Sequence, residues 1–344
     1  MSEGAKVEQL RVAIIGLGQI AKMGHIPGYR KAGADIVAGC DIRAEHAKQM
    51  CETFGIPRAY TDWKEMLAAG GFDAVSVCTP IVHHGAMAAE CARRGYHVLV
   101  EKPMAASLDE CDRMIDAAKQ RGVLLMVSHN QRYMPGHVAA RQIIRSGAVG
   151  APILVQTAFG HGGPEKWSPT GQWYFDPEQA KLGVMADLGY HKLDLVQWLI
   201  GQDVVGVSAF MGTFQKETPL EDTVTGILRF GGGAIGTFVA SWAYAADWEN
   251  SVTIRCAHGA VMIPEHDPFT VVVRRDLPGG KREEVTHRIS SEDSSGWLGS
   301  LGAFAEAVRK GLPAPVTGEE GRKVMEVLLA AYDSASTGKV HRLG

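Results

Sequence analysis

The sequence predicts an α/β fold with a doubly wound parallel sheet in the first part of the chain, followed by an α+β part with a mostly antiparallel sheet. In the first 128 residues, short runs of Val, Ile, Leu and Ala alternate with segments of helical periodicity, which is the pattern of parallel β-α-β units. After about residue 150, closely spaced strand-like runs replace this alternation. The chain has 344 residues, more than one hydrophobic core usually supports, so we expect two domains.

The first domain, residues 1–128, contains five apolar runs that we predict to be strands buried on both faces of a parallel sheet. These runs are Leu10–Ile15, Ile36–Cys40, Ala74–Cys78, His97–Val100 and Val123–Ser128. Helices are expected between them, because apolar residues recur there at helical spacing. The expected helices run from a glycine turn to about Ala32, and over Ala44–Phe54, Gly85–Arg94 and Leu108–Arg121.

The second domain, residues 129–344, is predicted to be α+β, with C-terminal helices that could pack back on the first domain. Its expected strands are Ile153–Phe159, Val204–Phe214, Thr223–Phe230, Ala234–Trp242, Ser251–Cys256, Ala260–Ile263, Thr270–Arg275 and Arg282–Ile289. Three consecutive glycines, residues 231–233, predict a hairpin between two of these strands. The expected helices are Val138–Ser146, Val184–Leu199, Trp297–Arg309 and Gly318–Ser336.

Composition argues against several classes of protein. The formal net charge is -3 without a cluster of Lys and Arg, whereas a nucleic-acid partner would require a basic surface. No apolar run approaches the roughly 18 residues that span a bilayer, and the polar N-terminus does not resemble a signal peptide, so we expect a cytoplasmic protein without membrane contact. The six cysteines are scattered, which favours reduced thiols over a disulfide framework or a metal site.

A glycine turn after the first strand predicts a dinucleotide site. Gly16 permits a tight turn, Gly18 lets the backbone approach a pyrophosphate, and Ala21 is small enough for the helix to pack against the strand. The turn also contains Gln19 and Ile20, and the helix that follows presents free N–H groups and a positive dipole to the phosphates.

The residue that closes the second strand predicts which dinucleotide binds. Asp41 lies 20 residues after Ala21, where a carboxylate can accept both hydroxyls of an adenine ribose. It would repel a 2′-phosphate, so NAD is favoured over NADP. Arg43, in the loop that follows, could accommodate that phosphate, but we interpret it as a surface charge.

Two further motifs follow strands at the carboxyl edge of the parallel sheet, where ligands bind in such folds. Thr79 and Pro80 end the third strand and could lie against the nicotinamide half of the cofactor. Lys102, between Glu101 and Pro103, follows the fourth strand. An ammonium there could stabilise negative charge on a substrate oxygen during hydride transfer, although an exposed structural lysine is the alternative.

One helical segment of the second domain concentrates polar groups. Asp187 and His191 are four residues apart, and Asp194 follows three residues later, so the three side chains should project from one helix face. A neutral imidazole oriented by a carboxylate is a good general base near pH 7. We therefore predict His191 as the base that removes an alcohol proton, with Asp187 as its orienting group or as a substrate ligand. A divalent metal site and a structural ion pair remain alternatives.

These motifs together resemble the Gfo/Idh/MocA family of oxidoreductases, named for glucose-fructose oxidoreductase, inositol dehydrogenase and a rhizopine catabolism protein. The resemblance rests on the glycine turn, Cys78-Thr79-Pro80 with His84, Glu101-Lys102-Pro103, and Asp187-x-Gly189-x-His191-x-x-Asp194. It implies a Rossmann domain, an open-faced sheet domain that makes dimer or tetramer contacts, and a catalytic group of Lys102, Asp187 and His191. It also implies that Asp194 touches substrate hydroxyls, and that His84, Glu101, Lys102 and Asn130 lie at the cofactor.

One departure from the family pattern lies just before the Asp187 motif. Family members often carry three glycines there, whereas this chain has Lys181-Leu182-Gly183. The preceding segments contain His161 and Trp173 among several aromatic residues. We expect these two to contact the substrate, because aromatic rings can stack on a sugar, with core packing as the alternative.

The sequence therefore predicts an NAD-dependent dehydrogenase that acts on a secondary alcohol of a sugar or an inositol-like polyol, in a homodimer or homotetramer. A sugar-nucleotide dehydrogenase would require a second anion site. An NAD-using glycosidase and a non-catalytic sugar sensor are the other functions that this fold could support.

Overall fold

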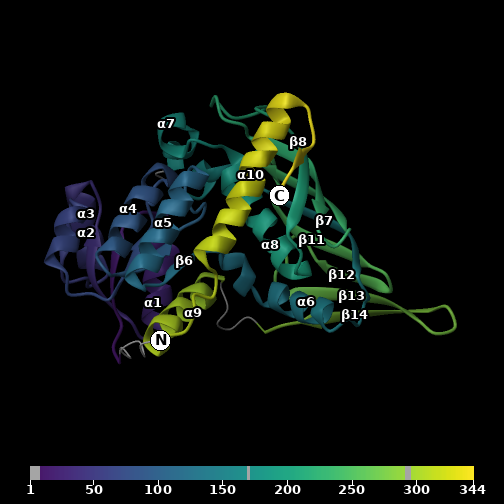
Figure 1. The fold of residues 1–344 in the computed structure, drawn as a ribbon, viewed down its shortest axis with the longest axis horizontal. Helices are drawn as coiled ribbons and strands as arrows, with labels where there is room; N and C mark the ends of the chain where they lie inside the picture. The colour runs from purple at the N-terminus through teal and green to yellow at the C-terminus, as the bar shows by residue number, and fades with distance from the viewer. Residues whose placement is uncertain (1–7, 169–170, 291–295) are drawn as a thin grey trace. The chain divides into compact units, whose positions relative to one another are not determined.

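A computed structural model describes residues 8–168, 171–290 and 296–344. Residues 1–7, where the sequence predicts no signal peptide, lie outside the described residues. The chain divides into two compact units (Figure 1). The first comprises Met1–Asn130 and Trp297–Lys323, and the second comprises Gln131–Gly296 and Val324–Gly344.

The first unit is built on a six-stranded parallel sheet with the order β3-β2-β1-β4-β5-β6. Its strands are β1 (Arg11–Ile15), β2 (Asp35–Cys40), β3 (Ala59–Tyr60), β4 (Ala74–Val77), β5 (His97–Val100) and β6 (Leu125–Val127). The chain order reverses at β1, because β2 and β3 extend the sheet on one side and β4 to β6 extend it on the other. This topology confirms the predicted doubly wound sheet and places the ligand crevice at the carboxyl ends of β1 and β4.

All helices of this unit except α9 lie between successive strands of its sheet. The helices are η1 (Ala21–His25), α1 (Ile26–Lys31), α2 (Ala44–Thr53), α3 (Trp63–Ala69), η2 (Ile81–His83), α4 (His84–Arg93), α5 (Leu108–Arg121) and, from the C-terminal part, α9 (Gly296–Lys310). Helix α5 begins where Ser107 Oγ accepts a hydrogen bond from Glu110 N, and it ends at Gly122 in a left-handed conformation. Helix α9 is attached to α1 in part through Arg309, which donates to Ala32 O at 2.7 Å.

The second unit is built on a nine-stranded mixed sheet with the order β14-β13-β12-β11-β7-β10-β9-β8-β15. The strands are β7 (Pro152–Gly160), β8 (Val204–Gly212), β9 (Thr223–Phe230), β10 (Ile235–Ser241), β11 (Glu249–Cys256), β12 (Gly259–Ile263), β13 (Thr270–Leu277), β14 (Lys281–Arg288) and β15 (His341–Arg342). Strands β7 and β10 pair in parallel in the middle of the sheet, and the other described pairs are antiparallel. The predicted mostly antiparallel sheet and the glycine hairpin between β9 and β10 are confirmed.

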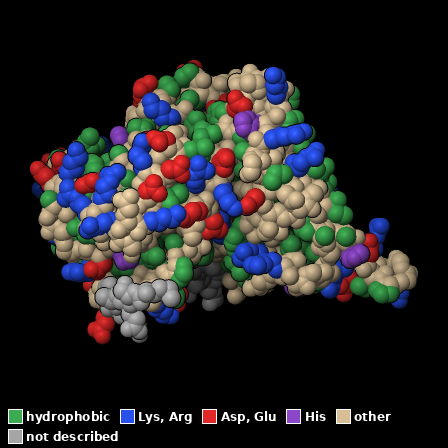
Figure 2. Space-filling view, in the orientation of Figure 1, with side chains coloured by type: hydrophobic (Ala, Val, Ile, Leu, Met, Phe, Trp, Pro, Cys, Tyr) green, Lys and Arg blue, Asp and Glu red, His purple; other side chains and the backbone are tan. Residues whose placement is uncertain are grey.

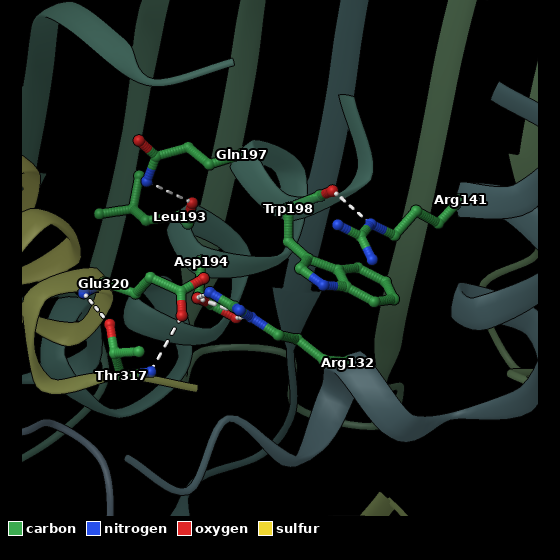
Figure 3. A network of polar contacts seen from close by, with 8 residues as sticks. All are labelled: Arg132, Arg141, Leu193, Asp194, Gln197, Trp198, Thr317 and Glu320. Carbon is green, nitrogen blue, oxygen red and sulfur yellow. Dashed lines mark hydrogen bonds and ion pairs between the residues drawn. The ribbon is translucent and has the colours of Figure 1, made fainter. Parts of the chain in front are cut away.

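The helices of the second unit gather on one face of this sheet (Figure 1). They are η3 (Asn130–Tyr133), α6 (Pro135–Arg145), η4 (Pro164–Lys166), η5 (Gly171–Phe175), α7 (Pro177–Ala180), η6 (Met185–Gly189), α8 (Tyr190–Ile200) and α10 (Gly318–Thr337), whose first turn belongs to the first unit. The long α10 begins in a capping box, in which Thr317 and Glu320 exchange hydrogen bonds between side chains and backbone (Figure 3). No helix in the described part of the chain is long and apolar enough to cross a membrane. Positive and negative side chains of the described residues are interspersed on the face drawn in Figure 2.

Candidate active site

The glycine turn of the first unit is shaped for a dinucleotide. Gly16 has a φ of +88°, and a Cβ at this position would lie 2.6 Å from Cys78 O, so a larger residue cannot adopt this turn. A Cβ at Gly18 would meet no atom within 4 Å, which leaves space beside the backbone. At the start of the helix that follows, Lys22 N donates to Gly18 O at 3.1 Å. The N–H groups before Lys22 have no carbonyl one turn earlier in a helix, so they can serve a pyrophosphate.

Asp41 lies at the end of β2 and is largely buried. One of its oxygens accepts a hydrogen bond from Leu17 N in the glycine turn at 3.3 Å, and Arg43 Nε and Nη2 donate to the two carboxylate oxygens at 3.0 and 3.1 Å. Burial raises the pKa of Asp41, but its hydrogen bonds with Arg43 outweigh this effect and hold the pKa below its usual range. The carboxylate is therefore ionised at neutral pH beside the turn.

His84 joins the two motifs that follow β4 and β5. Its ring nitrogens lie 2.8 Å from Pro103 O and 2.7 Å from Thr79 O, and the Lys102-Pro103 peptide bond is cis. Because both nitrogens contact backbone carbonyls, His84 fixes the loop that carries Thr79 and Pro80 against the turn that follows Lys102. Its contact with the nicotinamide half of the cofactor stays a prediction.

Glu101 is the centre of a buried polar network beneath Lys102. One carboxylate oxygen lies 2.9 Å from His25 Nε2, and the other accepts a hydrogen bond from Lys102 N at 3.1 Å. The second ring nitrogen of His25 contacts Ser76 Oγ, which also bonds Tyr29 OH. Burial raises the pKa of Glu101, but the hydrogen bond and charge of His25 outweigh it, so the pKa is lowered overall. The network thus connects the helix that follows the glycine turn with the backbone of Lys102.

Asn130 lies at the end of the first unit and is buried. Among the described residues, its Oδ1 has no hydrogen-bond partner, although buried polar atoms are normally paired. A ligand atom would satisfy this acceptor. Together with the open space at Gly18 and the ionised Asp41, this observation fits a bound NAD.

In the second unit, the predicted polar groups lie on the π-helical turn η6 and helix α8. Asp187 and His191 have exposed fractions of only 6% and 9%. Asp187 Oδ2 accepts a hydrogen bond from Trp242 Nε1 at 3.0 Å, and the His191 ring packs against Phe159 at 5.9 Å between centroids. Asp187 is thus held by an aromatic residue directly after β10 and His191 by one in β7. His161 packs on the same Phe159 ring at 6.0 Å.

Asp194, the third residue of this motif, forms a buried ion pair with Arg132 (Figure 3). Arg132 Nη2 lies 2.6 Å from Oδ1, and Nε donates to both oxygens, at 3.2 and 2.9 Å. The two-pronged geometry is typical of strong arginine–carboxylate pairs. Asp194 therefore ties helix α8 to η3, and its predicted contact with substrate hydroxyls stays a prediction.

The segment that departs from the family's glycine pattern takes an unusual backbone conformation. Lys181 has a φ of +61° and a ψ of -36°. Gly183 remains a glycine because a Cβ there would lie 2.2 Å from Glu221 O. The half-buried Glu221 accepts hydrogen bonds from Met185 N and from Tyr332 OH, which anchors the start of η6.

The aromatic segment before α7 forms a packed cluster. Trp173 stacks on Tyr174 with ring centroids 3.9 Å apart, and Trp242 contacts Tyr174 and Phe175 edge to face. His161 Nδ1 accepts a hydrogen bond from Gly163 N at 3.0 Å. Trp173 thus belongs to a cluster that reaches Trp242, the residue bonded to Asp187.

Two residues in these networks, His25 and Trp242, were not singled out from the sequence. His25 lies in the helical segment that follows the glycine turn, and Trp242 directly follows β10. Only Trp242 carried a usable signal, because a buried indole N–H normally requires an acceptor. No group of three or more potential metal ligands occurs within the described residues.

Comparisons with known proteins agree with this architecture. Residues 10–129 match the model of the NAD-binding Rossmann fold of an oxidoreductase family, and residues 137–262 match the GFO/IDH/MocA C-terminal domain. The chain is 25% identical to the myo-inositol 2-dehydrogenase of Thermotoga maritima, with 94% of this chain and 96% of the relative covered. It is 28% identical to the D-glucoside 3-dehydrogenase of Escherichia coli, with 96% of each covered.

A solved structure agrees as well. The aldose-aldose oxidoreductase from Caulobacter crescentus, complexed with glycerol, matches with a TM-score of 0.86 at 26% identity, and the match covers 98% of this chain and 100% of that chain. The predicted family and the predicted NAD cofactor are confirmed. The chain belongs to the Gfo/Idh/MocA family of NAD-binding oxidoreductases.

Proposed function

We propose that the protein is an NAD-dependent dehydrogenase that oxidises a secondary alcohol of a sugar or of an inositol-like polyol. The burial of Asp187 and His191 on one helical segment, held by Trp242 and Phe159, is the observation that supports this most. Polar groups are costly to bury, so two of them beside an aromatic cluster favour a catalytic role over a structural one. The relatives named for inositol and glucoside oxidation support this substrate class.

The catalytic roles follow from the chemistry of alcohol oxidation. NAD, when bound, supplies the acceptor for the hydride. His191 takes the hydroxyl proton as general base, and Asp187 orients that imidazole or binds a neighbouring hydroxyl. Lys102 stabilises the negative charge that develops on the oxygen.

We assign cofactor binding to residues 1–128, and substrate binding and oligomerisation to residues 129–344. Asp41 would bind the adenine ribose and the glycine turn the pyrophosphate, and the remaining contacts would lie near the nicotinamide half. The proposed cofactor residues are Gly16, Gly18, Gln19, Ile20, Asp41, Thr79, Pro80, His84, Glu101, Lys102 and Asn130. The proposed substrate residues are Lys102, His161, Trp173, Asp187, His191 and Asp194.

We also propose that the protein forms a homodimer or homotetramer through the sheet face that its helices leave open. Phe210, Ile227 and Ile235 have exposed fractions of 77%, 58% and 50%. Directly paired residues, and residues two apart in one strand, lie on the same face of a sheet. Phe210 pairs with Thr225, which is two residues from Ile227. Ile227 pairs with Thr237, which is two residues from Ile235, so all three apolar side chains share one face. Exposed apolar side chains gathered on one face favour a protein partner, and we take that partner to be a second copy of the chain.

The experiment that tests the proposed activity is a screen of NAD reduction over inositols, aldoses, anhydrosugars and glycosides. We expect one ring-shaped polyol or sugar to reduce NAD, and Lys102→Ala and His191→Ala each to abolish turnover, because charge stabilisation or the base is lost. The affinity for NADH, measured by fluorescence titration, should stay within about threefold of wild type. Lys310→Ala and His266→Ala, at exposed positions, are matched controls.

Other outcomes would select a different function. Release of an aglycone without net accumulation of NADH would indicate an NAD-using glycosidase, and no reaction with the entire panel would favour a sugar sensor. Near-full activity of either alanine variant would remove that residue from the catalytic group.

A further inference from the structure

Trp242 is a buried aromatic residue with a polar contact to the proposed catalytic group. It directly follows β10 and has no exposed surface. Its Nε1 donates a hydrogen bond to Asp187 Oδ2 at 3.0 Å. A hydrogen bond to an ionised carboxylate is roughly twice as strong as one between neutral groups, so this contact can hold Asp187 in one orientation.

The backbone of Trp242 is anchored independently of its side chain. Trp242 N donates to Asp222 O at 2.7 Å. The Asp222 carboxylate is itself fixed, since it accepts hydrogen bonds from the backbone N–H groups of residues 214–216 and from Thr223 Oγ1. The loop between β8 and β9 therefore holds the backbone from which the indole projects.

The indole ring also contacts the aromatic segment that we expect at the substrate. Its centroid lies 6.3 Å from that of Tyr174 and 5.7 Å from that of Phe175, both in edge-to-face arrangements. Tyr174 in turn stacks on Trp173. One side of Trp242 therefore touches the aromatic cluster, and its N–H touches Asp187.

We propose that Trp242 is a positioning residue of the catalytic site, which fixes the Asp187 carboxylate through its indole N–H and couples it to the aromatic cluster of residues 173–175. This inference rests on the proposed function, because it acts through Asp187. Preorganised polar groups contribute to catalysis by requiring no rearrangement during the reaction. Loss of the indole N–H should therefore slow the chemical step more than it weakens substrate binding.

The test is a double-mutant cycle with Trp242→Phe, which removes the donor and retains an aromatic ring. A lost hydrogen bond to a charged group predicts a fall in kcat of about 10- to 100-fold, while KM and the affinity for NADH change by less than about threefold. In an Asp187→Ala background, the same substitution should have little further effect on the single-turnover rate, because the acceptor of the indole N–H is already gone. Trp198→Phe removes the indole N–H of a different tryptophan, which lies on α8, and should leave kcat within about twofold.

A spectroscopic measurement checks the contact without catalysis. The protein has seven tryptophans, and the indole N–H signal of Trp242 can be assigned as the one missing from Trp242→Phe. In Asp187→Asn this signal should shift more than those of the other indoles.

The outcomes separate this inference from the proposed function. An unshifted Trp242 signal, a Trp242→Phe rate within twofold of wild type, or equal losses in both backgrounds of the cycle would overturn the inference. A wild-type protein that oxidises no sugar or polyol would instead overturn the proposed function.

Discussion

At the scale of single residues, Lys192 is a fully buried basic side chain of the second unit, which is costly to bury. It has no exposed surface, and its ammonium contacts Asn250 Oδ1, Ser251 O and the Phe159 ring. Burial lowers the pKa of Lys192 to about 7, although the charge of Glu249 acts in the opposite direction. The neighbouring His137 is neutral, because burial and the charge of Lys192 lower its pKa to about 3.

Lys192 should therefore make stability depend on pH. Between pH 7 and about 10.5, the unfolded chain holds the lysine proton and the folded protein does not, so the contribution of Lys192 to the free energy of unfolding becomes more favourable as pH rises. Below pH 7 Lys192 is protonated in both the folded and the unfolded state, so the folded protein bears the full cost of burying the charged lysine. The lowered pKa of Lys192 corresponds to a burial penalty of about 1.4 kcal/mol per pKa unit, which Lys192→Met removes. The substitution also leaves Asn250 unpaired, at a cost of about 2 kcal/mol. We therefore expect Lys192→Met to raise the free energy of unfolding by about 3 kcal/mol at pH 6 and hardly at all at pH 9, where deprotonation has already relieved much of the penalty.

Chemical denaturation of both proteins at the two pH values measures this difference. Lys310→Met, at an exposed lysine paired with Glu306, is the control and should show no such dependence. An equal gain from Lys192→Met at pH 6 and pH 9 would contradict the proposed cause.

Asp41 should set the preference between the two dinucleotides. In Asp41→Ala the carboxylate that repels a 2′-phosphate is gone, and Arg43 loses its partner. We expect the ratio of kcat/KM for NAD to that for NADP to fall by about tenfold or more, an effect of about 1.4 kcal/mol. Adding Arg43→Ala should reverse the gain with NADP. An unchanged ratio in Asp41→Ala would remove this residue from the cofactor site.

At the scale of elements, the backbone before η6 carries local strain. Lys181 is the non-glycine residue with a positive φ in the described chain, and conformations of this kind cost of order 1–3 kcal/mol. Its side chain contributes little in return, because its contact with Glu178 is exposed. Glu221 and Tyr332 hold the following residues in place.

We therefore expect Lys181→Gly to raise the free energy of unfolding by about 1 kcal/mol, after allowing for the greater freedom of glycine in the unfolded chain. Lys181→Ala keeps the strained conformation and is the matched control, with no gain expected. Thermal and urea unfolding give the comparison. A loss of stability in the glycine variant would show that the lysine side chain stabilises this turn.

Element type was predictable from the sequence wherever periodicity was strong. The predicted strands of both sheets occur within a few residues of their expected bounds, and α5 matches its prediction at both ends. The short α3 was missed because its seven residues are too few to establish a period, although Asp62 caps it. The π-helical turns η1 and η6 were also missed, because propensity does not distinguish them from α-helix.

The site was predictable only in part, for a similar reason. Motif spacing identified Asp187, His191 and Lys102 as candidates because it operates over short distances in the chain. Partners such as Trp242 lie far away in sequence, 55 residues from Asp187, and only the fold brings them together. The pairing of Asp194 with Arg132, 62 residues apart, was hidden for the same reason.

At the scale of the whole molecule, the open face of the nine-stranded sheet should determine the oligomeric state. Ile227→Lys places a charge in the middle of the exposed apolar group of Phe210, Ile227 and Ile235. We expect light scattering after gel filtration to show a dimer or tetramer for the wild type and a smaller species for this variant. Leu312→Lys, at an exposed leucine of the first unit, should leave the mass unchanged. A monomeric wild type, or an Ile227→Lys protein of unchanged mass, would refute the proposed interface.

The connection between β7 and β8 has a consequence for how this scaffold can diversify. Residues 161–203 leave the middle of the sheet and re-enter near its edge, and this one stretch carries His161, Trp173, Asp187, His191 and Asp194. Strands β7 and β10 pair directly with each other, so their register is set by their own backbone hydrogen bonds and not by this stretch. An exchange of residues 161–183 as one segment would thus replace His161 and Trp173, the proposed substrate residues, while leaving the proposed base His191 and the strands of the sheet in place.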